Sequence, residues 1–413
     1  MDALKQLKLA KNGYIIMSVL FMVLGACLII WPDCSMAVFC TAVGIMLIVY
    51  GLIKILGYFS RDIYCLAFQF DLAFGVLMAA VGIIGAGTWG TALAVLLNNN
   101  GQDVTIWSAF DTEIQEMSRT RRHKNLPEVV LPDQIQMTAD LRTAMAEKDM
   151  LIMAVPSVYV RSTAAKMKEY LRYGQIVVDV AKGIEEQSLM TMSQVIEEEL
   201  PLAEVAVLSG PSHAEEVSRG LPTTCVAAAH RKKTAEFMQS VFMSPVFRIY
   251  TSPDMLGVEI GAALKNVIAL AAGTADGLGC GDNTKAALIT RGIAEIARLG
   301  IAMGGKQQTF YGLSGIGDLI VTCASMHSRN RRAGILIGKG YTMDEAMKEV
   351  QMVVEGVYSA KAGLLLAQKY GCDMPIVSQV NQVLFDGKSP KEALADLMMR
   401  DPRIESSDLP WEG

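Results

Sequence analysis

A glycine-rich turn near residue 85 limits the folds open to this 413-residue chain more than any other feature. The turn reads GAGTWG, with glycines at Gly85, Gly87 and Gly90. The short apolar run Val81–Ile84 precedes it, and the longer apolar stretch Thr91–Leu97 follows it. A short buried run is typical of a strand in a parallel sheet, and the longer stretch favours a helix. The sequence therefore predicts a strand, a tight turn and a helix in immediate succession.

The spacing of the three glycines is that of a dinucleotide-binding turn. The first glycine permits the tight turn, the second lets the backbone approach a pyrophosphate, and the third lets helix and strand pack closely. The helix that begins there directs its positive end at bound phosphates. We therefore predict that Gly85, Gly87 and Gly90 bind NAD or NADP. A purely structural glycine turn is the alternative interpretation.

The residues after the second expected strand bear on the choice of cofactor. That strand covers Val104–Trp107 and is followed by Ser108, where an Asp or Glu would accept the ribose 2′-hydroxyl of NAD. Three arginines follow at Arg119, Arg121 and Arg122. They could hold the 2′-phosphate of NADP or form an ordinary solvated helix face. Both cofactors therefore stay open.

The rest of the chain alternates between strand and helix before it becomes helical. Further strand-like apolar runs occur at residues 150–155, 175–180, 204–209 and 223–229. This alternation is typical of an α/β Rossmann-type fold with a doubly wound parallel sheet. After about Pro253 only long helical patterns follow. We predict a dinucleotide-binding Rossmann domain over residues 78–252 and an all-α C-terminal substrate and catalytic domain over residues 253–413.

Two apolar stretches at the start of the chain indicate a membrane segment. Tyr14–Trp31 and Met36–Ile53 each hold eighteen residues without a formal charge. About 20 such residues span a bilayer as a helix. We predict an N-terminal transmembrane helical hairpin within residues 1–77, in which residues 63–77 form an interfacial helix rather than a third crossing. A secretory signal peptide and a buried soluble hairpin are the alternatives.

The charges around this hairpin indicate its orientation. Lys5, Lys8 and Lys11 precede the first stretch, Lys54 and Arg61 follow the second, and the linker PDCS has no basic residue. By the positive-inside rule both ends lie in the cytoplasm. The catalytic domain would then be cytoplasmic and anchored to the cell membrane.

The composition argues against two other kinds of partner. The chain has 37 basic and 42 acidic residues, for a net charge of −5, so nucleic acid is not an expected partner. Its eight cysteines show no CxxC pair and no metal-ligand spacing. We therefore expect neither disulfides nor a bound metal.

Three later stretches carry residues suited to binding a small anion. In VDVAKGIE, Lys182 follows an expected strand, at the edge where such sheets bind ligands. In LSGPSHAEEV, Gly210 and Ser212 stand at a similar strand end. In SGIGDLIVTCASMHSRNRRAG, Asp318 is followed by the run Ser328-Arg329-Asn330. An arginine fork is the usual partner of a phosphate.

A fourth stretch, GVEIGAALKNVIALAAG, places Lys265 in an otherwise apolar helix. Burial of an ammonium group lowers its pKa and makes it a usable proton donor or acceptor near neutral pH. The alternative is a lysine at the rim of a helix whose charged end reaches water.

The stretches occur in the order found in one known family. From Val81 to about Glu405 the motifs GAGTWGTALA, VPS, KGIE, SGPSHAEEV, ALKNVIALAAG, GDNTKAALITRG, GIGDLIVTC, SRNRR and VVEGV resemble NAD(P)-dependent sn-glycerol-3-phosphate dehydrogenase of bacterial type. The resemblance does not cover the first 80 residues. It implies reversible NAD(P)H-dependent reduction of dihydroxyacetone phosphate to sn-glycerol 3-phosphate, for glycerophospholipid synthesis, and it suggests a homodimer.

The resemblance also implies a role for each matching residue. Lys265 would donate a proton to the substrate oxygen during reduction and accept one in reverse, with Lys182 as the second catalytic lysine. Substrate contacts would come from Lys182, Gly210, Ser212, Asp318, Ser328, Arg329 and Asn330. Cofactor contacts would come from Gly85, Gly87, Thr88, Trp89, Gly90, Ala214, Arg329, Val353 and Glu355. Ala181 stands before Lys182, where the family often has Thr or Ser.

Two other functions fit parts of the sequence. A related two-domain NADP-dependent keto-acid or hydroxy-acid reductase would use a similar helical lysine but would bind a carboxylate. A membrane-anchored sensor or scaffold would bind the cofactor without turnover and would not need Lys182, Lys265, Asp318 and Arg329. The role of the predicted hairpin is also open, since it could deliver product to the bilayer or be an incidental fusion.

Overall fold

The computed structural model describes residues 78–402 and 404–405. The chain divides into two units, Met1–Leu77 and Met78–Gly413, and the described residues belong to the second. The predicted membrane hairpin, its orientation and the interfacial helix over residues 63–77 lie outside the described residues.

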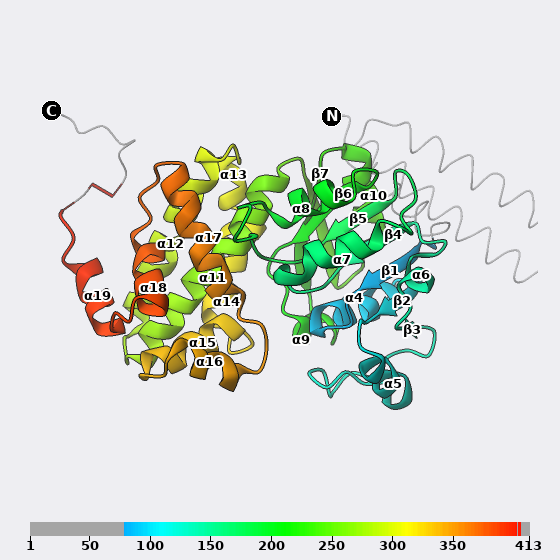
Figure 1. The fold of residues 1–413 in the computed structure, drawn as a ribbon, viewed down its shortest axis with the longest axis horizontal. Coiled ribbons are helices and arrows are strands. Elements are labelled where there is room, and N and C mark those ends of the chain that lie inside the picture. Colours follow the sequence, from blue (N-terminus) through cyan, green and yellow to red (C-terminus); the bar gives the residue numbers. More distant parts are fainter. Residues whose placement is uncertain (1–77, 403, 406–413) are drawn as a thin grey trace, which may run out of the picture. The chain divides into compact units, whose positions relative to one another are not determined.

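An eight-stranded sheet forms the first part of the described chain (Figure 1). The strand order is β3-β2-β1-β4-β5-β6-β7-β8. Neighbouring strands pair in parallel except β6 and β7, which are antiparallel. The strands are β1 (Ala80–Ile84), β2 (Asp103–Trp107), β3 (Gln136–Thr138), β4 (Met150–Met153), β5 (Ile176–Asp179), β6 (Glu204–Ser209), β7 (Thr223–Ala229) and β8 (Phe247–Ser252).

This sheet confirms the Rossmann-type fold expected from the sequence, with two differences. The strands β7 and β8 run opposite to the other six, so the sheet is mixed rather than fully parallel. The strands β3 and β8 were not predicted, because β3 has only three residues and β8 alternates between buried and exposed positions at an edge. The last strand ends at Ser252 and the first long helix begins at Met255.

Helices cover both faces of the sheet because successive strand residues point to opposite sides. Ile83 packs into the core under α4 (Thr88–Asn99), α5 (Asp111–Thr120) and α10 (Lys232–Phe242). Ile84 packs into the core under α6 (Leu141–Met145), α7 (Val160–Met167) and α8 (Met192–Glu199). The short helices η1 (Ser157–Tyr159) and α9 (Ala214–Val217) follow β4 and β6.

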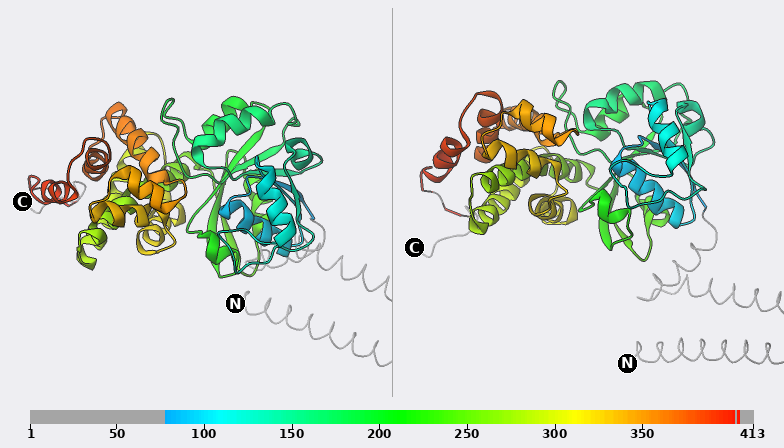
Figure 2. Two further views of the ribbon diagram at one scale, coloured as in Figure 1. Left: turned by 60° about the horizontal axis from the view of Figure 1, so that its bottom comes forward. Right: turned by 90° about the horizontal axis from the view of Figure 1, so that it is seen from below.

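The second part of the described chain is helical and is built around α11 (Met255–Gly277), as the all-α prediction requires. Figure 2 shows this helical region beside the sheet from two further directions. Its other helices are α12 (Asp282–Ala302), α13 (Gln307–Phe310), the π-helical turn η2 (Leu313–Gly317), α14 (Asp318–Ala324), α15 (Arg329–Gly338), α16 (Met343–Val350), α17 (Glu355–Lys369), α18 (Pro375–Phe385) and α19 (Pro390–Met398).

Helix α11 is a core helix. Among the described residues it is the one helix long and apolar enough to cross a bilayer, yet 89% of its most apolar window is buried. Asp254 caps its first turn, because the Asp254 carboxylate accepts a hydrogen bond from the Gly257 amide at 2.9 Å. It crosses α15 closely, since a Cβ on Gly273 would lie 2.1 Å from the Arg331 carbonyl oxygen. This crossing holds the start of α15 against the middle of α11.

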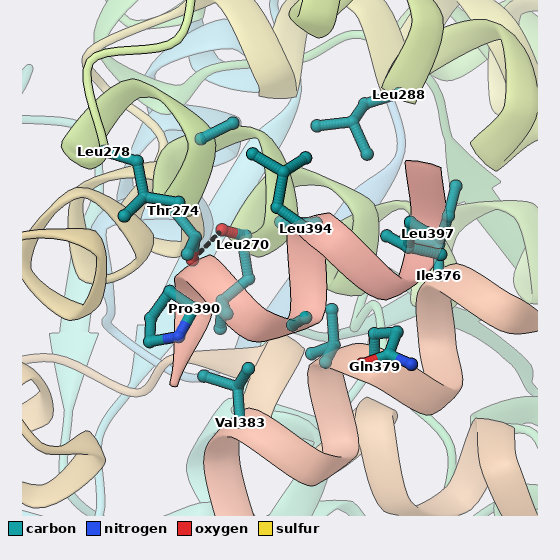
Figure 3. Close-up of a pocket in the computed structure, with 14 residues that line it drawn as sticks. Leu270, Thr274, Leu278, Leu288, Ile376, Gln379, Val383, Pro390, Leu394 and Leu397 are labelled. Carbon is teal, nitrogen blue, oxygen red and sulfur yellow. Dashed lines mark hydrogen bonds between the residues drawn. The ribbon is translucent and has the colours of Figure 1, made fainter. Parts of the chain in front are cut away.

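A small apolar cavity of about 50 Å³, open on one side, lies among α11, α12, α18 and α19 (Figure 3). Its walls include Leu270, Leu288 and Leu397. The Thr274 hydroxyl in this wall donates to the Leu270 carbonyl of its own helix at 2.9 Å. None of the predicted site residues lines this cavity, so the chemistry must be sought elsewhere.

Candidate active site

The glycine turn joins β1 to α4 in the conformation that its sequence requires. Gly85 has a φ of +127°, and a Cβ there would lie 2.6 Å from the Ala154 carbonyl oxygen. A Cβ on Gly90 would lie 2.1 Å from the Gly85 carbonyl oxygen. A Cβ on Gly87 would meet nothing within 4 Å. The first and third glycines are therefore required by packing, whereas the second leaves its backbone open to a ligand.

The surroundings of this turn fit a dinucleotide. No side chain caps α4 at Gly87, so the first amides of the helix are left for an anion. The buried indole nitrogen of Trp89 has no hydrogen-bond partner among the described residues. Trp89 packs beside Ala214, and the Asn125 amide donates to the Thr88 hydroxyl at 3.3 Å. The predicted cofactor residues Thr88, Trp89 and Ala214 thus gather at the turn.

One carboxylate joins the two lysines predicted to be catalytic. Lys182 follows β5, Lys265 lies in the middle of α11, and Asp318 opens α14. The Lys182 ammonium lies 2.8 Å from one Asp318 oxygen, and the Lys265 ammonium lies 2.9 Å from the other. The Lys265 ammonium also donates to the Thr322 hydroxyl at 2.7 Å. Three segments that are distant in sequence therefore form one charged cluster, the Lys182–Asp318–Lys265 cluster.

Burial sets the protonation of this cluster. Lys265 is 5% exposed, so it does not lie at a helix rim. Burial lowers the pKa of Lys265 to about 8; the Asp318 carboxylate opposes this shift and Lys182 adds to it. Burial by itself would raise the pKa of Asp318, but Lys182 and Lys265 outweigh it and lower that pKa below its usual value. At neutral pH the carboxylate is thus charged, and Lys265 can gain or lose a proton.

Two more predicted substrate residues contact Lys182. Its ammonium donates to the Gly210 carbonyl at 3.0 Å and to the Ser212 hydroxyl at 3.4 Å. The Lys182 side chain remains 18% exposed, more than the 6% of Lys265. Lys182 is therefore the lysine of the cluster that is more open to a ligand.

A chain of hydrogen-bonded amides connects Lys182 to three helices. The Asn266 side chain donates to the Lys182 carbonyl at 3.1 Å, and the Asn330 side chain donates to Asn266 at 2.9 Å. The Gly356 amide donates to Asn330 at 2.8 Å. Both the nitrogen and the oxygen of the Asn330 side chain are thus hydrogen-bonded within the protein. This network fixes the backbone of Lys182 against α11, α15 and α17.

Sequence reasoning missed two members of this arrangement. Asn266 and Thr322 are both buried and both contact the cluster or its support. Each left a signal in the sequence. Asn266 directly follows Lys265 in a helix that is otherwise apolar, and Thr322 lies four residues after Asp318, which places it on the same helix face.

Arg329 lies at the start of α15 without an acidic partner in contact. Among the described residues no hydrogen bond and no ion pair within 4 Å engages its guanidinium group. Burial lowers the pKa of Arg329, whereas the carboxylates of Glu355 and Glu215 oppose that shift. Ser328, next to it, caps α15 by accepting a hydrogen bond from the Arg331 amide at 3.2 Å. A partly desolvated, unpaired arginine is suited to binding an anion.

The two remaining cofactor residues lie around the start of α17. Glu355 accepts a hydrogen bond from the Ser157 amide at 3.1 Å, and the Ser157 hydroxyl donates to its other oxygen. Burial raises the pKa of Glu355, against the effects of Ser157 and Arg329. Val353 lies half-buried between α16 and α17. The described residues show no hydrogen bond from Val353 to the rest of the site.

Comparison with known proteins decides the family. Two parts of the family described as NAD-dependent glycerol-3-phosphate dehydrogenase match the chain: the N-terminal part over residues 80–235 and the C-terminal part over residues 254–395. The glycerol-3-phosphate dehydrogenase (NAD(P)+) of Agathobacter rectalis is 62% identical over 336 residues, which are 81% of this chain and 100% of that protein. This chain belongs to the glycerol-3-phosphate dehydrogenase family.

Other glycerol-3-phosphate dehydrogenases agree. That of Fusobacterium nucleatum is 59% identical over 331 residues, which are 79% of this chain and 99% of that protein. The crystal structure of glycerol-3-phosphate dehydrogenase from Coxiella burnetii matches with a TM-score of 0.76 at 35% identity and covers 78% of this chain and 99% of that one. Residues 16–85 match a separate family, described as a short repeat of unknown function. The resemblance inferred from the ordered motifs is thus confirmed for the dehydrogenase part.

Proposed function

We propose that this chain catalyses the reversible NAD(P)H-dependent reduction of dihydroxyacetone phosphate to sn-glycerol 3-phosphate, with Lys265 as the proton donor. The observation that carries the proposal is the buried Lys265 ammonium, which is held on Asp318 with a pKa of about 8. The membership of the dehydrogenase family supports the substrate and the cofactor.

The protein residues divide the chemistry between them. The reduced nicotinamide, when bound, delivers a hydride to C2 of the substrate. The Lys265 ammonium donates a proton to the C2 oxygen and becomes a neutral amine; in the reverse direction the amine takes up the alcohol proton. Asp318 orients Lys265, and its negative charge offsets the repulsion between the ammonium groups of Lys182 and Lys265. Lys182 binds the other Asp318 oxygen and contacts the substrate.

The far end of the substrate is a phosphate dianion, and the start of α15 suits it. Arg329 offers an unpaired guanidinium group, and Ser328 and Asn330 lie next to it in the chain. Gly210 and Ser212 contact Lys182, the more exposed lysine of the cluster. Binding energy gained at the phosphate orients the carbonyl towards Lys265, which lowers the barrier for the chemical step.

The cofactor residues form a second group. Gly85, Gly87 and Gly90 with the start of α4 hold the pyrophosphate, and Thr88, Trp89 and Ala214 lie around that turn. Arg329, Val353 and Glu355 contact the cofactor from the helical domain. The buried, unpaired Trp89 nitrogen and the uncapped helix end support this part of the proposal.

A steady-state comparison tests the reaction. Purified protein should oxidise NADH or NADPH with dihydroxyacetone phosphate at least a hundredfold more efficiently than with ketopantoate, about 2.7 kcal/mol of discrimination, because Arg329 and its neighbours favour a phosphate over a carboxylate. A preference for ketopantoate would favour the keto-acid reductase instead. Cofactor binding without turnover of any phosphorylated ketose would favour the scaffold.

We also propose that residues 1–77 anchor the enzyme to the cell membrane with its catalytic domain in the cytoplasm, where the product would serve glycerophospholipid synthesis. The support is the two uncharged stretches and the match of residues 16–85 to a family separate from the dehydrogenase. Fractionation of cells expressing the chain with and without residues 1–76 tests this. Activity that stays soluble with the full-length chain would contradict anchoring. The family resemblance also suggests a homodimer, which sedimentation of the detergent-solubilised protein would detect.

A further inference from the structure

We infer that this enzyme uses NADH in preference to NADPH, and that Glu113 is the residue that sets this preference. The inference rests on the proposed function, since it names which of two cofactors serves that reaction. The residues around the end of β2 carry the inference, because the sequence alone leaves the choice between NAD and NADP open.

The end of β2 lies directly beside the glycine turn. Ile84 and Trp107 are partners in the parallel pairing of β1 and β2, and the Gly85 amide donates to the Trp107 carbonyl at 3.0 Å. Ser108 follows at once and is 3% exposed. In a sheet of this kind a side chain at the tip of the second strand contacts the adenosine ribose of the bound dinucleotide. Whatever acidic or basic group stands there distinguishes a 2′-hydroxyl from a 2′-phosphate.

The structure places a carboxylate at this point, although no acidic residue follows β2 directly in the sequence. The chain turns after Ser108, and the Glu113 amide donates to the Phe110 carbonyl at 3.1 Å. This turn brings the Glu113 side chain, from the first turn of α5, back to the strand end. The Ser108 hydroxyl donates to its Oε2 at 2.6 Å and accepts from the Phe110 amide at 3.2 Å.

The second oxygen of this carboxylate is available. In the described part of the chain no hydrogen bond or ion pair engages Glu113 Oε1, and the residue is half-buried rather than fully solvated. Ser108 therefore fixes the carboxylate while leaving an acceptor at the cofactor edge. A ribose 2′-hydroxyl can donate to such an acceptor. A 2′-phosphate, which carries negative charge itself, is repelled by it.

The arginines that kept NADP open as a cofactor do not hold their charged groups at this position. Arg121 donates to the Leu131 carbonyl at 3.2 Å and lies 3.5 Å from Asp133. Arg122 donates to the Pro127 carbonyl. Both therefore bind the loop that follows α5. Arg119 lies six residues after Glu113, about 240° around the helix and so on another face.

The one histidine near Glu113 does not supply a positive charge either. His123 is 2% exposed, and burial lowers its pKa even though Glu113 opposes the shift. His123 is therefore neutral at neutral pH. His123 therefore does not offset the charge of Glu113 at the β2 end.

Cofactor titration of the purified full-length protein tests the inference. Binding of NADH and NADPH, followed by nicotinamide fluorescence without substrate, should favour NADH by about tenfold or more. In Glu113→Gln this ratio should fall at least about tenfold, chiefly because NADPH binds more tightly once the repulsion is removed. The matched control is Glu116→Gln, an exposed carboxylate on the same helix, which should leave the ratio unchanged.

A second variant distinguishes the effect of the Glu113 charge from the effect of its orientation. Ser108→Ala keeps the charge of Glu113 but removes the hydroxyl that holds it, and it should lower the NADH preference by a smaller factor than Glu113→Gln. It also carries the test if Glu113→Gln unfolds, since Glu113 stabilises the first turn of α5 as well. The value of kcat/KM with dihydroxyacetone phosphate and each cofactor should follow the same order.

Two results would overturn the inference. One is a wild-type protein that binds NADPH as tightly as NADH. The other is an unchanged ratio in a folded Glu113→Gln protein. Failure to turn over dihydroxyacetone phosphate would refute the proposed function. The cofactor preference would still be measurable, because the binding ratio is determined without substrate.

Discussion

The two ends of the site are built in different ways. The dinucleotide turn consists of consecutive residues, Gly85 to Gly90, and its binding groups are backbone amides. The Lys182–Asp318–Lys265 cluster takes one charged side chain from each of three segments. At the turn, packing excludes a side chain at Gly85 and at Gly90. At the cluster, burial and charge set the protonation of each group.

The two ends are therefore sensitive to different substitutions. The conformation of the turn is sensitive to an added atom at Gly90 and less so to substitutions in distant segments. The cluster tolerates no loss of a single charge, because its members are desolvated and rely on one another. Changes at the turn should therefore affect cofactor binding, whereas changes at the cluster should affect turnover and its pH dependence.

Replacing Lys265 should have the largest effect. Lys265→Met keeps the length of the side chain but removes the proton donor, so turnover should fall about 1,000-fold, within the range for a general acid. Cofactor affinity should not change. Steady-state rates and a fluorescence titration measure the two effects, with the exposed Lys391→Met as the control. A Lys265→Met protein that reduces the substrate at the wild-type rate would remove Lys265 from the mechanism.

Replacing Asp318 should damage both turnover and stability. Asp318→Asn leaves two ammonium groups in a buried site without their carboxylate, which should lower the free energy of unfolding by about 3–5 kcal/mol. Turnover should fall about 100-fold, because Lys265 loses its orienting partner and its pKa drops further. Urea unfolding and steady-state kinetics measure these changes.

The control for Asp318 is a pair of the same type at the surface. Asp396→Asn breaks the ion pair with Lys388, in which Asp396 is 55% exposed. The unfolding free energy should change by less than about 1 kcal/mol, because solvent screens such pairs. Equal losses in the two variants would show that the buried cluster has no special energetic role.

The pH dependence of turnover should follow the pKa of about 8 of Lys265. Reduction needs the ammonium form, so its rate should hold below that pH and fall about tenfold per unit above it. Oxidation needs the neutral amine, so its rate should fall below that pH instead. Burial lowers this pKa, and Asp318 opposes the shift, so in Asp318→Asn both limbs should move to lower pH. Reduction that stays constant to well above pH 9 would contradict the assignment.

A pair of glycine variants tests the turn. In Gly90→Ala the added Cβ meets the Gly85 carbonyl oxygen, so the turn must shift and cofactor affinity should weaken about tenfold, together with a loss of 1–3 kcal/mol in stability typical of overpacking. In Gly87→Ala the Cβ meets no protein atom, so stability should be kept while affinity falls. Titration and thermal unfolding separate the two outcomes. Unchanged affinity in Gly87→Ala would show that no ligand approaches this backbone.

The smallest effect should come from Thr322. Thr322→Val removes the hydroxyl that accepts from Lys265 but leaves the bond to Asp318, so turnover should fall about fivefold, the value of one hydrogen bond. Thr274→Val is the matched control, because its hydroxyl bonds only to its own helix. A loss as large as that in Lys265→Met would mean that Thr322 itself takes part in the proton transfer.

Much of the fold and part of the site could be predicted from local patterns. The turn, β1, α4 and β2 follow from apolar runs and glycines that stand next to one another, and the helical second part follows from its periodicity. Lys265 was identifiable because a charge in an apolar helix is unusual. The short β3 and the edge strand β8 escaped prediction, since neither forms a continuous buried run.

Other features depended on contacts between distant segments. Ser108 suggested that the β2 tip lacks an acid, yet the turn into α5 brings Glu113 there, and the nearby arginines bind loop carbonyls instead. Thr322 and Asn266 lie within the quoted motifs, but their contacts with Lys265, Lys182 and Asn330 come from the packing of α11 against its neighbours. No local pattern specifies such pairings, because they depend on which helix faces meet after folding.

Local sterics and hydrophobicity specify the backbone conformation of the turn and the apolar environment around Lys265, so both can be inferred without knowledge of the fold. Which charges lie within reach of one another depends on how distant segments pack. This packing places Asp318 between the two lysines and Glu113 beside the glycine turn, and electrostatic effects on pKa and specificity follow distances in space rather than in sequence.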